Sequence, residues 1–265
     1  MRIIYTGDMV GRPGREAIFN NIAKLREMYN FDVLIVNTDN AAHGFGVTPG
    51  ICRDLLEKGV TAIVTGDHVW NQREIIPFLD ECKQIVRPLN YPDNLPGCGA
   101  REIELVNGKK IVVAEVVGRL FMEAVDCPVQ AMDRLLKIYT LGKNVNAIFV
   151  DIHAEATAEK IAFGHYLDGR VSAVVGSHTH VPTSDTMILP KGTAYQTDAG
   201  MCGDYSGVIG FDIQAPIDRL CRRYTGSKLV PLNGRGTLFG TFIETDDKTG
   251  LALKIEPIRL EAPSK

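Results

Sequence analysis

The sequence predicts an α/β sandwich, in which two mixed β-sheets pack face to face and helices cover their outer faces. In the first half of the chain, short apolar runs alternate with helical patterns, which favours parallel strands joined by right-handed crossovers. The second half has more strand patterns than helical ones, and the total number of expected strands favours two sheets. No linker-like segment interrupts the 265 residues, so a single domain over residues 1–265 is expected.

The first half contains three expected strand-and-helix pairs. The first helix starts near Pro13, after a loop over Gly11–Gly14. Thr48 has the position of an N-cap before a second helix, which Gly59 ends. Asn71, with a glutamate three residues later, resembles a capping box that opens the third helix. The expected strands are Arg2–Thr6, Val33–Asn37 and Val60–Thr65.

The second half is expected to be rich in strands. Asn107-Gly108 is typical of a hairpin turn between strands at Arg101–Val106 and Lys110–Val116. A turn at Asp247–Gly250 joins the last two strands. The other expected strands are Ala147–Val150, Val171–Val175, Gly192–Gln196, Leu238–Glu244 and Leu251–Ile258.

Composition excludes several classes of protein. A net charge of −3 without a basic cluster argues against a stable nucleic-acid complex. No apolar run approaches the ~20 residues of a membrane-spanning helix. The first residues read directly into a strand without a signal-peptide cleavage pattern, so a cytoplasmic location is expected. The six cysteines lack CxxC spacing, which favours reduced thiols over disulfides or a zinc site.

Polar side chains follow five of the expected strands. A single aspartate there is commonly a helix cap or turn former, and a single histidine is commonly a packed side chain. Five such strand ends at one sheet edge, where α/β proteins bind ligands, favour a metal site instead. The residues concerned are Asp8, Asp39, Asn40, Asp67, His68, His153, His178 and His180.

The residue types restrict the metal. Imidazole and carboxylate ligands suit iron, manganese, zinc or nickel better than calcium. Three aspartates, one asparagine and three histidines exceed the needs of one ion, whereas two ions about 3.5–4 Å apart use them all. His178 and His180, two residues apart, are then expected to reach different ions. His43 and His165 fall outside the pattern and are expected to be ordinary surface or core histidines.

Five motifs resemble those of the YmdB-type bacterial cyclic-nucleotide phosphodiesterases, within the calcineurin-like metallophosphoesterase superfamily. They are T-G-D-M-V-G-R-P-G, T-D-N-A-A, G-D-H-V-W, D-I-H-A-E-A-T-A-E-K and G-S-H-T-H-V, and the resemblance spans nearly the whole chain. It implies the α-β-β-α metallophosphoesterase sandwich and a homo-oligomer. The implied activity is hydrolysis of small phosphodiesters, in particular 2′,3′-cyclic nucleotides and, as a further substrate, 3′,5′-cAMP.

The resemblance also implies roles for individual residues. Asp8, Asn40 and His180 would hold one ion, and Asp67, His153 and His178 the other, with Asp39 shared between both. The two ions are divalent or mixed-valence transition metals, with iron first and manganese as the alternative. In such a site, a hydroxide between the two ions would attack the phosphorus.

His68 corresponds to the family's proton donor, a general acid of the kind that contributes ~10²–10⁴-fold to the rate.

Two of these positions depart from the family pattern. The family's glutamate is Asp39 here, which shortens the reach of the carboxylate by ~1.5 Å. The family's asparagine is Asp67, which lowers the formal charge with two divalent ions from about +2 to about +1. We expect this extra charge to weaken phosphate attraction unless a trivalent iron restores the balance.

Two other functions fit the same residues. A phosphomonoesterase or nucleotidase uses the same metals. A regulatory protein that binds metal and nucleotide but hydrolyses weakly is consistent with the changes at Asp39 and Asp67, although retention of His68 argues against it.

The sequence does not assign substrate contacts. Phe45 or His43 is a candidate for stacking on a base, and Arg12 and Arg15 are candidates for a phosphate, but an ordinary loop and solvated arginines explain them equally well. Arg119 matches a family position without an assigned role.

Overall fold

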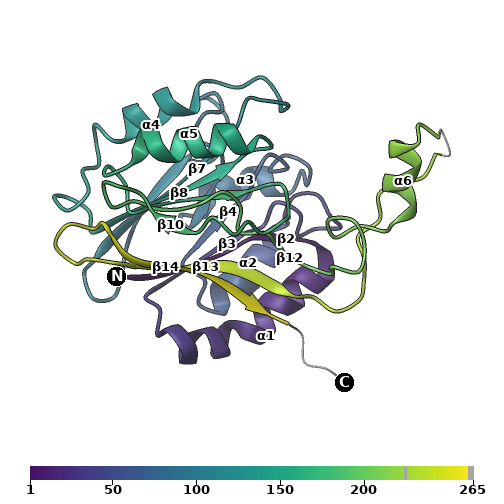
Figure 1. Cartoon of the computed structure of the whole chain (residues 1–265), viewed down its shortest axis with the longest axis horizontal. Helices are drawn as coiled ribbons and strands as arrows, with labels where there is room; N and C mark the ends of the chain where they lie inside the picture. The colour runs from purple at the N-terminus through teal and green to yellow at the C-terminus, as the bar shows by residue number, and fades with distance from the viewer. Residues whose placement is uncertain (224–225, 262–265) are drawn as a thin grey trace.

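The computed structural model describes residues 1–223 and 226–261 and has two six-stranded sheets packed face to face (Figure 1). The first sheet has the order β14 (Ala252–Leu260), β13 (Leu238–Thr245), β1 (Arg2–Thr6), β3 (Val33–Asn37), β4 (Ala62–Val64) and β5 (Ile85–Val86). The second has the order β10 (Met187–Ile188), β11 (Ala194–Gln196), β9 (Ala173–Ser177), β8 (Ala147–His153), β7 (Lys110–Val117) and β6 (Ala100–Glu104). A short parallel pair joins β2 (Asp8–Met9) to β12 (Met201–Cys202).

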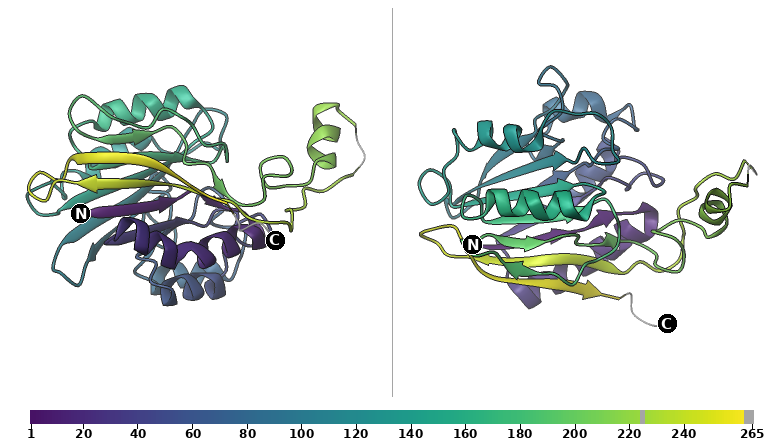
Figure 2. Two further views of the ribbon diagram at one scale, coloured as in Figure 1. Left: turned by 60° about the horizontal axis from the view of Figure 1, so that its bottom comes forward. Right: turned by 45° about the horizontal axis from the view of Figure 1, so that its top comes forward.

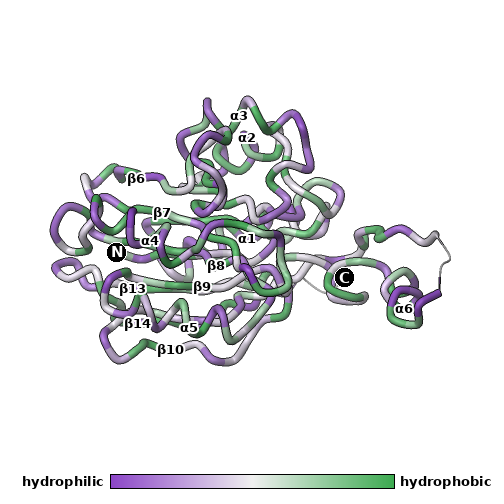
Figure 3. Tube along the Cα trace, turned by 90° about the horizontal axis from the view of Figure 1, so that it is seen from above, coloured by the Kyte–Doolittle hydropathy of each residue, from purple (hydrophilic) through white to green (hydrophobic). Residues whose placement is uncertain are grey.

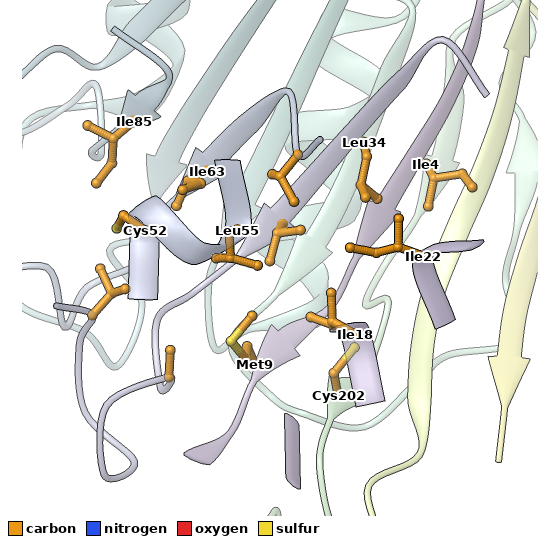
Figure 4. Packing of buried hydrophobic residues seen from close by; sticks show 14 of the residues in the cluster. Ile4, Met9, Ile18, Ile22, Leu34, Cys52, Leu55, Ile63, Ile85 and Cys202 are labelled. Atoms are coloured by element: carbon orange, nitrogen blue, oxygen red, sulfur yellow. The ribbon is translucent and has the colours of Figure 1, made fainter. Parts of the chain in front are cut away.

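Helices cover both outer faces, which confirms the predicted α-β-β-α sandwich (Figures 1 and 2). The apolar faces of α1 (Gly11–Tyr29), α2 (Pro49–Glu57) and α3 (Ile75–Glu81) share one buried cluster with the first sheet. Figure 4 shows Ile18 and Leu55 among the side chains packed there. The helices α4 (Pro128–Leu135) and α5 (Thr157–Leu167) cover the second sheet.

A separate apolar layer lies between the two sheets. Successive residues of a strand face opposite sides, so Ile4 contributes to the helix-facing cluster whereas Ile3 and Tyr5 contribute to the layer between the sheets. There the rings of Tyr5 and Phe149 lie 5.0 Å apart. Full burial of side chains of this size stabilises the fold by about 1.5–3 kcal/mol each.

The strand directions bring the site together. In the first sheet β1, β3, β4 and β5 are parallel, and in the second β7, β8, β9 and β11 are parallel. The antiparallel pairs of these two sheets lie toward their outer ends: β13 pairs with β1 and β14, β6 pairs with β7, and β10 pairs with β11. The loops that follow the parallel strands can therefore meet at the carboxyl edge of both sheets.

Local turn and cap chemistry is confirmed at two places. The Thr48 hydroxyl accepts a hydrogen bond from the Ile51 amide (3.3 Å) and caps α2. Gly108 has φ +76° in the hairpin turn between β6 and β7, where the amide of Lys109 donates to the side-chain oxygen of Asn107 (3.0 Å). Both devices involve residues close in sequence, which explains why the sequence identifies them.

Two local predictions are wrong. Gly11–Gly14 is the first turn of α1 and not a loop before it. Asn71 does not cap α3, which begins at Ile75 with Glu74 as its N-cap residue. The Asn71 amide instead donates to the carbonyl oxygen of His68 (3.0 Å), so these residues form the turn that carries His68.

One segment leaves the sandwich. Residues 205–223 and 226–235, called the arm below, extend from the body and carry α6 (Gln214–Leu220), as Figure 2 shows. In the described part of the chain, no helix combines the length and the apolar character needed to cross a membrane.

Candidate metal centre

The predicted metal-ligating residues meet where strands from both sheets end. Asp8 begins β2 directly beyond β1, Asp39 and Asn40 follow β3, and Asp67 and His68 follow β4. From the second sheet, His153 is the last residue of β8, and His178 and His180 follow β9. Asp8, Asp39, Asn40, His153 and His180 are buried, while Asp67, His68 and His178 are partly exposed.

His153 lies at the centre of the cluster. Its Nε2 atom lies 2.9 Å from Asp67 Oδ1, 3.1 Å from His178 Nδ1 and 3.7 Å from Asp39 Oδ2. Its Nδ1 atom lies 3.8 Å from Asp8 Oδ1. Asp67, His153 and His178 each offer one atom within 4.8 Å of the others, as do Asp8, Asp39 and His153. These donor atoms lie close enough together to ligate a shared cation.

Asn40 and His180 form a second pair at the same edge. His180 Nε2 lies 3.0 Å from Asn40 Oδ1, while His180 Nδ1 donates to the carbonyl oxygen of Ile209 (2.8 Å). The Nδ1 contact with a carbonyl fixes the proton on that nitrogen, so Nε2 has a free lone pair. His180 is thus oriented as a metal ligand is.

The negative charges of the clustered carboxylates favour a bound cation. Burial raises the pKa of Asp8 to about 7, and the Asp198 carboxylate adds to the rise. Burial raises the pKa of Asp39 well above its usual range, and the charges of Asp67 and Asp8 act in the same direction. Among the described residues, Asp8 Oδ1 is buried without a hydrogen-bond partner. Crowded carboxylates with an unpartnered oxygen fit a cation, and their oxygen and imidazole donors fit a transition metal.

The pKa values of Asp67 and His153 are both lowered, for different reasons. Burial disfavours the charged form of Asp67, yet contacts with His153 and His178 hold its pKa below the usual range. Burial lowers the pKa of His153 to about 4, so its imidazole is neutral at physiological pH. A neutral imidazole beside an ionised carboxylate is the protonation state that ligates a metal.

Buried hydrogen bonds orient His153. Its Nδ1 donates to Ser177 Oγ (2.9 Å), and that hydroxyl donates to Asp151 Oδ1 (2.6 Å). The Tyr5 hydroxyl donates to the other oxygen of Asp151 (2.6 Å), and Asn37 contacts both groups. This series of hydrogen bonds places the proton of His153 on Nδ1 and leaves Nε2 facing the carboxylates.

The loop with His178 and His180 is held under strain. Both histidines have left-handed backbone conformations, with φ of +88° and +63°, which cost roughly 1–2 kcal/mol each. The buried Asp198 carboxylate accepts from the amide and the hydroxyl of Thr179 (3.2 and 2.7 Å). The Lys160 ammonium donates to Asp198 (2.8 Å) and to the carbonyl of Ser177 (2.6 Å). These buried contacts stabilise the strained loop.

The Asp67–His68 turn is fixed by two carboxylates. The buried Glu115 side chain accepts from the amides of Thr65 (3.1 Å) and Gly66 (2.7 Å), and Asp39 Oδ1 accepts from the His68 amide (2.8 Å). Gly66 has φ +63°, and a Cβ there would overlap the Asp39 carboxylate. Only glycine at position 66 therefore permits the Asp39 carboxylate to lie this close to the backbone.

A cavity of about 390 Å³ opens above the cluster. One wall carries ligand candidates and His68, and the other is apolar. The ring centroid of Phe45 lies 5.1 Å from that of His68 and 5.7 Å from that of Phe211. The side chains that line the cavity are Asp39, Asn40, Phe45, His68, Glu155, His178, Thr179, His180, Ile209, Phe211 and Leu229.

Of the remaining sequence candidates, the arginines and the two other histidines lie outside the cavity. Arg12 donates to the carbonyl of Asn233 (3.2 Å), and Arg15 donates to the carbonyl of Ala41 (2.5 Å). His43 and His165 are exposed, as expected of histidines outside the pattern. Of the loop residues considered for substrate contact, Phe45 lines the cavity.

Two groups of residues at the site were not predicted from the sequence. The buried partners of the site, Glu115, Asp151 and Lys160, were not singled out. The signal of Glu115 and Asp151 was a charged residue inside an apolar run, V-V-A-E-V-V and F-V-D-I-H, whereas Lys160 had no such signal. Ile209 and Phe211 at the base of the arm line the cavity but follow no strand of the predicted kind, so no comparable signal marked them.

Comparison with known proteins identifies the family. The sequence profile described as YmdB-like protein matches residues 4–258. The chain belongs to the YmdB-like family.

Curated relatives and solved structures agree with this family. The chain is 44% identical over 258 residues to the 2′,3′-cyclic-nucleotide 2′-phosphodiesterase of Bacillus subtilis, covering 97% of this chain and 96% of that protein. It is 36% identical to a putative phosphatase/phosphodiesterase of Mycoplasma pneumoniae, covering 98% and 93%. A crystal structure of a hypothetical protein from Thermus thermophilus superposes with a TM-score of 0.90 at 39% identity, covering 99% and 100%. A novel phosphatase from Mycoplasma pneumoniae superposes with a TM-score of 0.91 at 34% identity, covering 98% and 93%.

The two departures from the family motifs lie inside the cluster. Asp39 belongs to two of the three groups of converging donors, with Asp8 and His153 in one and with Asp67 and His68 in the other. The shorter side chain thus still faces both halves of the site. Asp67 likewise belongs to two groups, so the added negative charge sits among the donors and not at their rim.

Proposed function

We propose that this chain is a metal-dependent phosphodiesterase that hydrolyses small phosphodiesters, with 2′,3′-cyclic nucleotides as the leading substrate class. The observation that carries the proposal is the convergence of carboxylate and imidazole donors around a buried, unpartnered oxygen of Asp8. Further support comes from the Bacillus relative, whose name is that of a 2′,3′-cyclic-nucleotide phosphodiesterase.

The proposed ligands divide into two sets. Asp67, His153 and His178 would hold one ion, and their mutual proximity in the structure supports this. Asp8, Asn40 and His180 would hold the other ion, and Asp39 would be shared by both. When bound, two transition-metal ions would activate a water molecule and neutralise charge on the phosphoryl oxygens. Iron is the first choice and manganese the alternative, because both accept mixed imidazole and carboxylate ligands.

The chain's own residues would orient the substrate and supply the proton. The apolar wall at Phe45 and Phe211 suits a nucleobase, because aromatic rings stack on its faces. His68 lines the same cavity and would donate a proton to the leaving alkoxide of the sugar. Burial lowers the pKa of His68, although the charge of Asp67 opposes that change. The lower pKa makes the protonated imidazole a better acid.

A phosphomonoesterase is the second candidate. Its support is the word phosphatase in the names of the Mycoplasma relative and of the superposed structure. The two activities differ in their products, because only a diesterase opens a cyclic phosphate.

The test is turnover of 2′,3′-cyclic AMP by protein reconstituted with Mn²⁺ or Fe²⁺, compared with His68→Ala. We expect the variant to lose 10²–10⁴-fold in kcat while it still binds Mn²⁺. The exposed His165→Ala is the matched control and should retain full activity. Absence of turnover by the wild type, in metal-replete protein that binds the nucleotide, would overturn the diesterase proposal and favour a nucleotide-binding regulator.

Assembly and location complete the proposal. We propose a single domain over residues 1–265 that forms a homo-oligomer and works in the cytoplasm without a stable nucleic-acid complex. The buried layer shared by both sheets supports the single domain. All six cysteines are free in the structure, which agrees with a reducing compartment.

A further inference from the structure

The arm exposes an apolar face that the rest of its own chain does not cover. Ile213, Ile217 and Leu220 are 51%, 39% and 84% exposed. Their spacing of four and three residues places them on one face of the α6 segment. Figure 2 shows that this segment stands away from the sandwich, and Figure 3 shows hydrophobic and hydrophilic stretches along it. A contiguous apolar face on a projecting segment is typical of an interaction surface.

The same chain carries an apolar groove in the helical layer that covers the second sheet. A cavity of about 700 Å³ lies between α5 and the loop before α4, and it is mostly apolar. Leu120, Val129, Phe163 and Tyr166 contribute to its lining. The Glu159 side chain fixes this loop, because it accepts from the amides of Arg119 (2.9 Å) and Leu120 (3.2 Å). The groove is therefore a preformed surface.

The arm and the loop at the edge of the groove carry opposite net charges. Residues 205–235 contain five basic and two acidic residues, a net charge of +3 in a chain whose total is −3. The groove itself is lined by one basic and one acidic residue, Arg119 and Glu159, and the loop whose two ends line it adds the exposed acids Glu123 and Asp126. Two arms would repel each other, whereas an arm and the edge of the groove attract. This difference favours arm-to-groove contact over arm-to-arm contact.

We propose that α6 of one chain docks, through Ile213, Ile217 and Leu220, into the α4–α5 groove of a second copy, and that two chains exchange arms reciprocally. The contact would also bring the arm of one chain close to the cavity above the metal-ligand cluster of the other chain. Ile209 and Phe211 at the base of the arm line the chain's own cavity. In the receiving chain, Glu155 lines the cavity three residues before Ala158, which lines the groove. A docked arm thus borders the partner's cavity.

The first test is the molar mass in solution, which does not depend on the proposed activity. We expect wild-type protein to have at least twice the 29.1 kDa of one chain by light scattering after gel filtration. Ile217→Asp with Leu220→Asp should lower that mass at least two-fold. Leu120→Asp in the groove should have the same effect. The matched control is Leu253→Asp on β14, which is 63% exposed and lies outside both surfaces, and it should keep the wild-type mass.

Charge reversal tests the pairing itself. Arg219→Glu with Arg222→Glu in the arm should lower the molar mass. Mixing this variant with a second one, Glu123→Lys with Asp126→Lys beside the groove, should restore the mass. Each variant should keep the wild-type melting temperature within a few degrees, since these side chains lie on the surface. A monomeric wild type, or an arm variant with unchanged mass, would overturn the proposal. A mass lowered by the arm variant but unaffected by Leu120→Asp would assign the arm to another surface and would also overturn it.

Discussion

Ser177→Ala tests how the structure prepares His153 for a metal. The hydroxyl of Ser177 is buried between His153 Nδ1 (2.9 Å) and Asp151 Oδ1 (2.6 Å). It accepts from the first and donates to the second, and in this way it fixes the imidazole tautomer. Ser177 is not itself among the proposed ligands, so its removal leaves the donor set intact and changes only how His153 is held.

The expected magnitude follows from these two contacts. Without the hydroxyl, the His153 N–H and one oxygen of Asp151 each lose a partner in a region closed to water. A buried polar group left without its partner costs about 1–3 kcal/mol. Loss of a partner behind a ligating histidine lowers metal affinity about 10–100-fold, equal to about 1.4–2.8 kcal/mol. We therefore expect Ser177→Ala to reduce both the free energy of unfolding and the affinity for Mn²⁺.

The matched control is Ser172→Ala, one residue before the start of the strand that ends at Ser177. Ser172 is equally buried, and its hydroxyl accepts from the Ile148 amide (3.0 Å) far from the cluster. Calorimetric titration of metal-free protein with Mn²⁺, combined with urea unfolding, separates the two effects. Ser172→Ala should lose stability and keep its Mn²⁺ affinity. If Ser177→Ala binds Mn²⁺ as wild type does, or if both variants lose affinity equally, the assigned role of the hydroxyl is wrong.

Three further predictions concern charge. The pKa of Asp8 is about 7 in the folded metal-free protein, above its unfolded value of 3.8, so stability present below pH 4 is lost as pH rises through 7. Mn²⁺ should therefore raise the melting temperature more at pH 8 than at pH 5, and equal shifts would contradict this. Lys160→Met leaves the buried Asp198 uncompensated and should cost about 3–5 kcal/mol in urea unfolding, unlike the exposed Lys143→Met. Asp67→Asn removes a negative charge beside the metals and should move the acid limb of the pH–rate profile to lower pH; coincident profiles would refute the charge argument.

The sequence by itself determined the elements and the ligand candidates. The α/β pattern, the Thr48 cap and the Asn107-Gly108 turn depend on neighbouring residues, so they were readable without the fold. Each ligand candidate likewise follows an apolar strand directly, and parallel strands place such residues at one edge. This explains why Asp8 and His153, 145 positions apart, were correctly predicted to meet.

The tertiary structure decided everything that depends on partners far along the chain. Asn71 had the right neighbours for a helix cap, yet it serves the turn after His68. Whether Lys160 meets solvent or Asp198 depends on how α5 packs on the second sheet. Burial, and with it the unpartnered oxygen of Asp8, arises only when strands from both sheets close around the site. Likewise, the apolar face of the arm is exposed because the chain carries it beyond the sandwich, and the residues of α6 alone do not specify that position.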